Sequence, residues 1–194
     1  MSIVLMGSTS GSCTLQEQAV AGTSVLTLPV GTGTVVANNV NSAIVSGTAV
    51  ASTSGTSITF SSIPSWAKRI TIILNGTAFS AANTVYLIQI GSGSVTTTGY
   101  LSQYSAAGAI TTGFAIGTTG GSATYASNGI ATLNLIGSNT WISTSSLAYT
   151  NVTAAGAVGN GSSPALGGAL DRVVITSVAG TATFTAGSIN ILYE

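Results

Sequence analysis

The sequence predicts an all-β protein, with a C-terminal antiparallel β-sandwich of the jelly-roll kind behind an extended N-terminal β arm. Apolar residues recur at a period of two, and not at the period of 3.6 that marks a helix. Clusters of Gly, Ser, Thr and Asn interrupt them about every eight to twelve residues, as turns do between short strands. Thr, Val, Ile and Tyr favour strands, and the helix formers Leu, Glu, Lys and Arg are scarce. We therefore expect no long helix.

Residues 1–51 form the expected arm. They include no aromatic residue, and their short strands, such as 24–28 and 34–37, are separated by Gly-Thr and Gly-Ser turns. Strands this thin bury little apolar surface alone, so we expect partner chains or a docking surface to order them. The stretch 43–59 is interpreted as a linker into the next domain. The candidate attachment residues are the apolar side chains Leu15, Val20, Leu26, Leu28 and Val35.

Residues 52–194 form the expected sandwich domain. Every Trp, Phe and Tyr of the chain lies beyond residue 58, so an extensive core can form only there. Roughly six to eight antiparallel strands over about 140 residues suggest a sandwich of the jelly-roll kind. The run 70–74 is apolar enough for a strand covered on both faces, whereas 181–185 alternates and predicts a half-exposed strand. The strongest predicted strands are 69–74, 84–90, 130–136, 172–178, 181–185 and 188–193.

The chain carries only six charged side chains in 194 residues, and their sum is zero. An average soluble domain is about 25 % charged, and a neutral surface with so few charges tends to self-associate. We infer a permanent oligomer, whose surface is either polar and uncharged or buried against identical subunits. Three cations gain little free energy from displacing the counterions of phosphates, so we expect no nucleic-acid partner.

Apolar runs in the sequence are short. Each is broken within a few positions by Ser, Thr, Asn or Gly, whereas a membrane-spanning helix needs about 18 to 20 apolar residues, so we expect no membrane partner. The start of the chain, MSIVLMG, has neither a basic region nor an apolar stretch of the length that a secretion signal needs. We therefore expect synthesis in a cytoplasm.

The residue types argue against an enzyme. The chain has no His, so a Ser-His-Asp triad cannot be built. Its carboxylates, Glu17, Asp171 and Glu194, are too few and too scattered for a zinc site or for the paired acids of a glycosidase. We expect no catalytic residue, no metal site and no cofactor.

Four of the six charges lie in two short segments at the starts of strong strands. Lys68 and Arg69 stand at one start, and Asp171 and Arg172 stand at the other. The favoured interpretation is a structural ion pair between Asp171 and Lys68 or Arg69, which fixes the register of two neighbouring strands. The alternative is a functional ionic site, but Asp171 has no second acid–base partner nearby in the sequence.

Aromatic residues supply the candidate binding surface. Trp66 and Trp141 stand beside turn residues, and we expect both to pack on the core, with contact to a sugar as the alternative. Four tyrosines lie where Gly, Ser and Thr predict exposed loops, and they are candidates either for carbohydrate contact or for core packing. These four are Tyr100, Tyr104, Tyr125 and Tyr149.

Two groups of short motifs stand at the two ends of the chain. The N-terminal group comprises GSTSG at 7–11, TL at 14–15, AVAGT at 19–23, LTLP at 26–29 and GTGTV at 31–35. The C-terminal group comprises SIPSWAKRIT at 62–71, QIGSG at 89–93, TTGY at 97–100, LDRV at 170–173 and AGSINILYE at 186–194. The first group resembles a short module of bacteriophage tail-fibre and other virion structural proteins. The second resembles a C-terminal β domain of the same kind of protein.

This resemblance implies a structural component of the virion, built as a homotrimer. Its N-terminal arm is expected to attach to other virion proteins of the tail or the capsid, and its β domain to point outward. Long fibres carry a shaft between such ends, and this chain has almost none, which favours a short fibre or tip. A displayed domain of this kind is a candidate for host attachment, through a carbohydrate receptor on the host surface.

Two alternatives remain open at the level of the sequence. The first is a head decoration or cement protein, whose arm ties capsid subunits together. The second is a Thr-rich module that binds ice or polysaccharide, which predicts Thr-x-Thr pairs at a fixed period. The pairs present, such as Thr32 with Thr34 and Thr181 with Thr183, are scattered.

Overall fold

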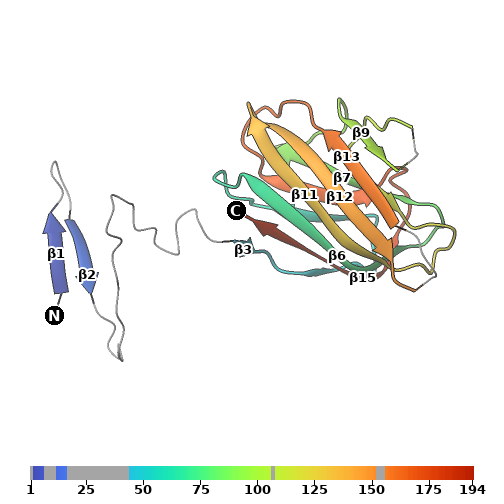
Figure 1. Ribbon diagram of the computed structural model, residues 1–194, viewed down its shortest axis with the longest axis horizontal. Helices are drawn as coiled ribbons and strands as arrows, with labels where there is room; N and C mark the ends of the chain where they lie inside the picture. Colours follow the sequence, from blue (N-terminus) through green and yellow to red (C-terminus); the bar gives the residue numbers. More distant parts are fainter. Residues whose placement is uncertain (1, 7–11, 17–43, 106–107, 152–155) are drawn as a thin grey trace. The chain divides into compact units, whose positions relative to one another are not determined.

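The structure is a computed structural model that describes residues 2–6, 12–16, 44–105, 108–151 and 156–194 (Figure 1). Within these ranges every regular element is a β-strand and every pairing is antiparallel, which confirms the all-β prediction. Nothing in the described ranges forms a helix long and apolar enough to cross a membrane. Contacts divide the chain into two units, Met1–Ala37 and Asn38–Glu194, and each is described by itself.

The N-terminal unit contains one described pair of strands. β1 (Ser2–Met6) runs antiparallel to β2 (Ser12–Gln16), which includes the candidate attachment residue Leu15. A two-stranded ribbon is marginally stable in water, so this pair needs further contacts to persist. The predicted strands at 24–28 and 34–37 lie outside the described residues. So do the other candidate attachment residues, Val20, Leu26, Leu28 and Val35.

The second unit contains two sheets in its described residues. The larger sheet has the spatial order β3 (Val45–Ser46), β15 (Phe184–Tyr193), β6 (Arg69–Phe79), β11 (Ser127–Gly137), β12 (Thr140–Tyr149), β13 (Gly156–Ser162) and β9 (Leu101–Tyr104), and β15 also pairs with β4 (Val50–Ala51). The smaller sheet has the order β10 (Phe114–Thr118), β7 (Val85–Ser92), β14 (Arg172–Ser177) and β5 (Ser57–Ser61), and β7 also pairs with β8 (Ser94–Val95).

The chain passes from one sheet to the other at most of its connections. From β5 it crosses to β6 and back to β7, and it crosses again on either side of β10 and of β14. It stays within one sheet at β3–β4, at the hairpin β7–β8 and in the meander β11–β12–β13, whose strands lie side by side in the larger sheet (Figure 1). As a result β14, late in the chain, lies between β5 and β7. This path confirms an antiparallel, jelly-roll-like sandwich.

A single core cluster draws side chains from both sheets. On β6, Ile70, Ile72 and Leu74 are buried. Ile73, which lies between Ile72 and Leu74, is partly exposed. The prediction that the run 70–74 is covered on both faces is therefore wrong, because over these residues β6 buries one face and leaves Thr71 and Ile73 on the other face partly exposed. Complete burial along a strand occurs instead on β14, where residues 173–177 are all buried.

The sheets approach each other closely where β10 packs against β12 and β13. Gly159 of β13 is buried there, and a Cβ atom on it would lie 2.3 Å from the carbonyl oxygen of Ala115. The Ser145 hydroxyl donates a hydrogen bond to the Ile116 carbonyl at 3.0 Å, which joins β12 to β10 across the interior. Only small side chains fit at this approach, which explains part of the high Gly and Ser content.

Part of the segment that we assign from the sequence to the arm and linker pairs with the sandwich. β3 and β4 both pair with β15, and Ser52 after them is fully buried. The Ser52 amide donates to the Gly187 carbonyl at 2.9 Å, and its hydroxyl donates to the Ala186 carbonyl at 2.7 Å. Residues 45–52 therefore belong structurally to the edge of the larger sheet, not to a free linker.

The last strand is longer than its sequence pattern suggests. Residues 184–193 form one strand, β15, where two strands at 181–185 and 188–193 are predicted. The pairing of β15 with β6 shifts register between Phe184 and Ala186 and again between Ala186 and Ser188. These irregularities interrupt the alternation of burial, so a bulged strand has the sequence pattern of two short strands.

Candidate functional site

The largest feature on the sandwich surface is the outer face of the larger sheet. We define this outer face by the side chains of β15, β6, β11, β12, β13 and β9 that point away from the core. β12 shows the alternation clearly, because Trp141 and Leu147 are buried whereas Ile142 and Thr144 are exposed. The exposed residues of neighbouring strands lie opposite one another, so they form continuous rows across the sheet.

A polar row crosses the middle of the outer face. Cross-strand pairing places opposite one another, in order, Thr71, Thr132, Thr144, Asn160 and Gln103. We call its first three members the Thr row. Their separations in the sequence hide this alignment, since the Thr row is made by strands from different parts of the chain. Only the register of three strands, β6, β11 and β12, reveals it.

Apolar side chains occupy the rows on either side of the polar row. One of these rows is Ile73, Ile130, Ser146 and Val158, and the other is Arg69, Asn134, Ile142, Ser162 and Leu101. Four of these side chains are strongly exposed: Leu101 at 71 %, Val158 at 56 %, Ile130 at 48 % and Ile142 at 38 %. The outer face therefore exposes large apolar groups in register with uncharged polar ones.

The outer face is almost free of charge. Arg69 is the one charged side chain in the three rows, and it lies on β6, toward one border. It forms an ion pair with Glu194, at the end of the chain. Two shallow hollows on this face have linings without an acid or a base, one lined by Ile130, Thr132 and Thr144 and the other by residues that include Leu101 and Ile142. The recess at the β6–β15 border of the face is different, because its lining includes Thr71 and both partners of the Arg69–Glu194 ion pair.

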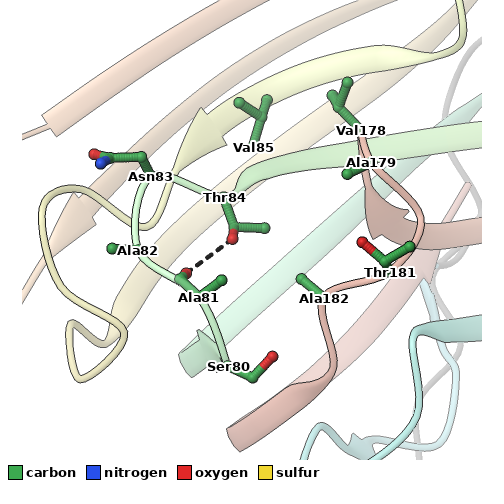
Figure 2. A pocket seen from close by; sticks show the side chains of 10 residues that line it. All are labelled: Ser80, Ala81, Ala82, Asn83, Thr84, Val85, Val178, Ala179, Thr181 and Ala182. Atoms are coloured by element: carbon green, nitrogen blue, oxygen red, sulfur yellow. Dashed lines mark hydrogen bonds between the residues drawn. The ribbon is translucent and has the colours of Figure 1, made fainter.

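A third hollow, of about 460 Å³, lies at one end of the sandwich (Figure 2). Its walls are the β6–β7 connection at 80–85 and the β14–β15 connection at 178–182. None of the ten residues drawn in Figure 2 is charged, and the Thr84 hydroxyl donates to the Ala81 carbonyl at 2.8 Å. This hollow can accommodate a small group, but its lining offers no acid–base catalyst.

Tyr100 is buried, unlike a loop residue that contacts a receptor. Its ring is 0 % exposed and packs edge-on against Phe114, with 5.0 Å between ring centres. Its hydroxyl accepts a hydrogen bond from the Ile90 amide at 3.0 Å and donates to the Thr96 carbonyl at 3.0 Å. Burial raises the pKa of Tyr100 to about 12. The hydroxyl holds the β7–β8 turn, so this ring is not available to a ligand.

The other candidate tyrosines lie nearer the surface. Tyr149 is 8 % exposed. Its pKa is raised mainly by burial and to a smaller extent by the nearby Tyr104. The half-buried Tyr125 lies beside it, with 5.9 Å between ring centres. Tyr104 is half-buried on β9. The structure thus brings Tyr125 and Tyr149 together, and it leaves Tyr104 and Tyr125 as the more accessible of the four rings.

The two tryptophans pack on the core, as predicted. Trp141 is 2 % exposed and belongs to the core cluster. Trp66 is partly buried against that cluster, and its ring centre lies 5.8 Å from that of Tyr193. Neither ring stands free on the surface, so the sugar-facing alternative for them loses its geometric basis.

The predicted ion pair between Asp171 and Lys68 or Arg69 is replaced by two others. Arg69 pairs with Glu194, and Asp171 pairs with its neighbour Arg172, with 2.7 Å between Oδ1 and Nε. The physical reason is topological: Arg69 begins β6 in the larger sheet, whereas Arg172 begins β14 in the smaller one. The two segments therefore are not neighbouring strands.

The Asp171 carboxylate also closes a turn. The Gly93 amide donates to Asp171 Oδ2 at 2.9 Å. The Arg172 hydrogen bond, and then this amide, hold the pKa of Asp171 below its ordinary value. The Lys68 amide donates to the Glu194 carbonyl at 2.6 Å, so the chain end is tied to the start of β6 by backbone as well as by charge. We interpret both ion pairs as structural, because one closes a turn and the other ties the end of the chain to β6.

Within the described ranges, no three His, Cys, Asp or Glu side chains gather closely enough to hold a metal ion. No protein-family model, curated protein or solved structure matches the chain. The candidate site is therefore identified from its geometry and not from similarity to a known protein. That site is the uncharged outer face of the larger sheet.

Proposed function

We propose that the protein is a non-enzymatic structural subunit of a bacteriophage particle, a short trimeric fibre or tip that displays its sandwich outward. The observation that carries this proposal is the broad outer face, which suits packing against other protein surfaces and whose three rows contain one charged side chain, Arg69, already paired with Glu194. The motifs at both ends of the chain, which resemble virion structural proteins, support the phage assignment.

In this proposal the N-terminal unit attaches the subunit to other virion proteins. Its described strands, β1 and β2, form a ribbon that is marginal alone and gains stability from a docking surface. The sandwich is the displayed part, and its half-buried Tyr104 and Tyr125 are the rings through which it contacts carbohydrate on a host surface. No cofactor or metal enters this function.

The direct test is to quantify the chain in purified phage particles by mass spectrometry against isotope-labelled peptides. A short fibre or tip predicts a small multiple of three copies per particle, lost when tails are removed. Hundreds of copies that remain with tail-free heads would instead assign the chain to capsid decoration. Complete absence from particles would contradict any virion role.

One observation favours a second candidate function, the binding of ice or polysaccharide. The Thr row places Thr71, Thr132 and Thr144 side by side on one face of the sheet, an array that the scattered Thr pairs of the sequence do not reveal. Thermal hysteresis and glycan-array binding of the whole chain test it, with Thr144→Lys as the variant. Binding by the wild type that the variant loses supports this function, and no binding by the wild type removes it.

A further inference from the structure

We propose that the outer face is the surface through which copies of this chain pack against one another. The proposal deepens the one above and rests on it for the statement that subunits associate. It adds which surface does so and commits to one occupant, the outer faces of the two neighbouring copies of the trimer, with all three faces turned toward a common threefold axis.

The exposed apolar groups are the first argument. Leu101, Ile130, Ile142 and Val158 come from four adjacent strands, and each is more than a third exposed. Ile130 and Val158 lie in one row and Ile142 and Leu101 in the other, with a serine between the members of each pair. Single exposed apolar residues are normal on a protein surface, but four large ones spread over one nearly uncharged sheet face indicate an interaction site. Leaving these side chains in water forgoes the burial that drives most protein association.

The shortage of charge on the outer face indicates which kind of partner it can bind. A nucleic acid or an acidic glycan is recognised by cations, and the one cation in the three rows, Arg69, is already paired with Glu194. A strongly charged protein would have to lose the hydration of its own charges against this face without gaining an ion pair. A second copy of this chain has no such cost, since the whole chain has six charges in 194 residues.

The pattern of the rows suits packing against itself. The polar row has an apolar-containing row on each side of it. If the strands of three copies run along a common threefold axis, equivalent rows lie at the same height, so apolar side chains meet apolar side chains. The hydroxyls and amides of the polar rows then lie near each other and can exchange hydrogen bonds.

The size of the face agrees with a stable interface. Six strands that each take up about 4.8 Å occupy roughly 29 Å, and three rows that each take up about 6.7 Å along the strands occupy roughly 20 Å. This gives a footprint of roughly 580 Å², and the corrugation of the side chains brings the accessible surface nearer to the ~800 Å² that each partner buries in a standard complex. A small ligand would leave most of this area uncovered.

The test places a lysine on the outer face of the full-length chain and measures assembly mass by sedimentation velocity over a dilution series. The variants are Val158→Lys and Ile142→Lys, which bring a charge into the apolar rows, and Thr144→Lys, which does so in the polar row. All three side chains point to solvent in the single chain, so the sandwich fold accommodates them. The matched control is Val178→Lys, which is 40 % exposed but lies at the hollow of Figure 2, off the outer face.

We expect the wild type and Val178→Lys to sediment as one assembly. The three face variants should raise the dissociation constant at least a hundredfold and run as single chains, with circular dichroism spectra and melting curves like those of the wild type. If Val158→Lys fails to fold, Thr144→Lys still decides the question, because it removes no apolar contact.

Face variants that assemble as the wild type does would overturn this inference and leave the proposed function standing. A wild-type single chain at all concentrations would overturn the inference and the trimer together. A single chain whose residues 1–37 become more sensitive to protease in Val158→Lys would mean that the N-terminal unit of the same chain covers the face, which also overturns the inference.

Discussion

Buried hydroxyl groups fasten the turns and sheets of this sandwich in a chain that has few charges to use. Tyr100 Oη joins the Ile90 amide and the Thr96 carbonyl at the β7–β8 turn. Ser102 Oγ accepts from the Ala115 amide at 2.8 Å, and Ser145 Oγ donates to Ile116, so both tie the larger sheet to β10. Each such bond contributes about 1 kcal/mol, and losing one partner of a buried pair costs more.

The Tyr100 hydroxyl makes the stability of the fold sensitive to alkaline pH. In the unfolded chain the phenol ionises at its ordinary pKa of 10.0, and in the folded chain burial raises this pKa to about 12. The stabilisation is therefore complete below pH 10 and is lost as the pH rises toward 12, because the unfolded state releases its proton first. Burial of Tyr86 acts in the same direction.

We predict that the free energy of unfolding, measured in urea from pH 8 to 12, falls above pH 10. Tyr100→Phe should lower this free energy by about 1–3 kcal/mol at pH 8, because it leaves the Ile90 amide without its acceptor. It should also flatten the alkaline fall, because the variant has no phenol at this position to ionise. Tyr125→Phe, at a half-buried ring, is the control and should follow the wild type. Identical pH profiles for Tyr100→Phe and the wild type would show that the buried hydroxyl is not responsible.

Among the elements, β10 packs closely against strands of the other sheet. It packs across β13, where Gly159 leaves no space for a methyl group: a Cβ atom would lie 2.3 Å from the Ala115 carbonyl and 2.7 Å from Ser145 Oγ. Backbone atoms cannot move aside as the end of a flexible side chain can. The closeness of the two sheets at this end therefore depends on Gly159.

We predict that Gly159→Ala destabilises the sandwich by about 1–3 kcal/mol or more through overpacking. Chemical denaturation of the full-length chain measures this loss. Gly121→Ala is the matched control, because an added Cβ there meets nothing within 4 Å, and its stability should stay within about 0.5 kcal/mol of the wild type. Equal stability of the two variants would mean that the sheets are not tightly apposed at β13.

The strongest predicted strands match parts of β6, β7, β11, β14 and β15, whereas β12 and β13 were not among them, and the pairing of the strands was not predictable. Alternating or continuous apolar residues predict β6, β7, β11 and β14 because each strand buries a face or lies within a sheet, which the sequence records locally. The Thr row depends on which strands are neighbours and in what register, and no local pattern encodes that. The sequence does not predict β3 and β4 as strands for a related reason. Each has two residues, and a strand so short has almost no alternation to detect.

The candidate site was harder to predict than the fold, because residue type does not report burial or neighbours. Tyr100 lies in a Gly/Ser/Thr-rich stretch that predicts an exposed loop, yet its ring fills the core beside Phe114. Asp171 and Arg69 stand in similar sequence settings, but the topology places their strands in different sheets. The outer face was foreseen only in general, as uncharged surface buried against identical subunits.

At the scale of the whole molecule, the shortage of charge and the exposed apolar rows are two aspects of one property. A free subunit with this surface would have neither charge repulsion nor full burial to keep it from associating. Ordered association through the outer face removes both problems, and it does so without ion pairs. The assembly should therefore resist salt, which screens charged interfaces but strengthens apolar ones or leaves them unchanged.

The most direct measurement is the mass of the full-length wild-type chain in solution, by sedimentation equilibrium at low and high salt. We predict a stable assembly of three chains whose mass is the same at about 0.05 M and 1 M NaCl, over which the Debye length falls from above 10 Å to about 3 Å. A soluble single chain at all concentrations, or an assembly that dissociates as the salt concentration rises, would contradict the account.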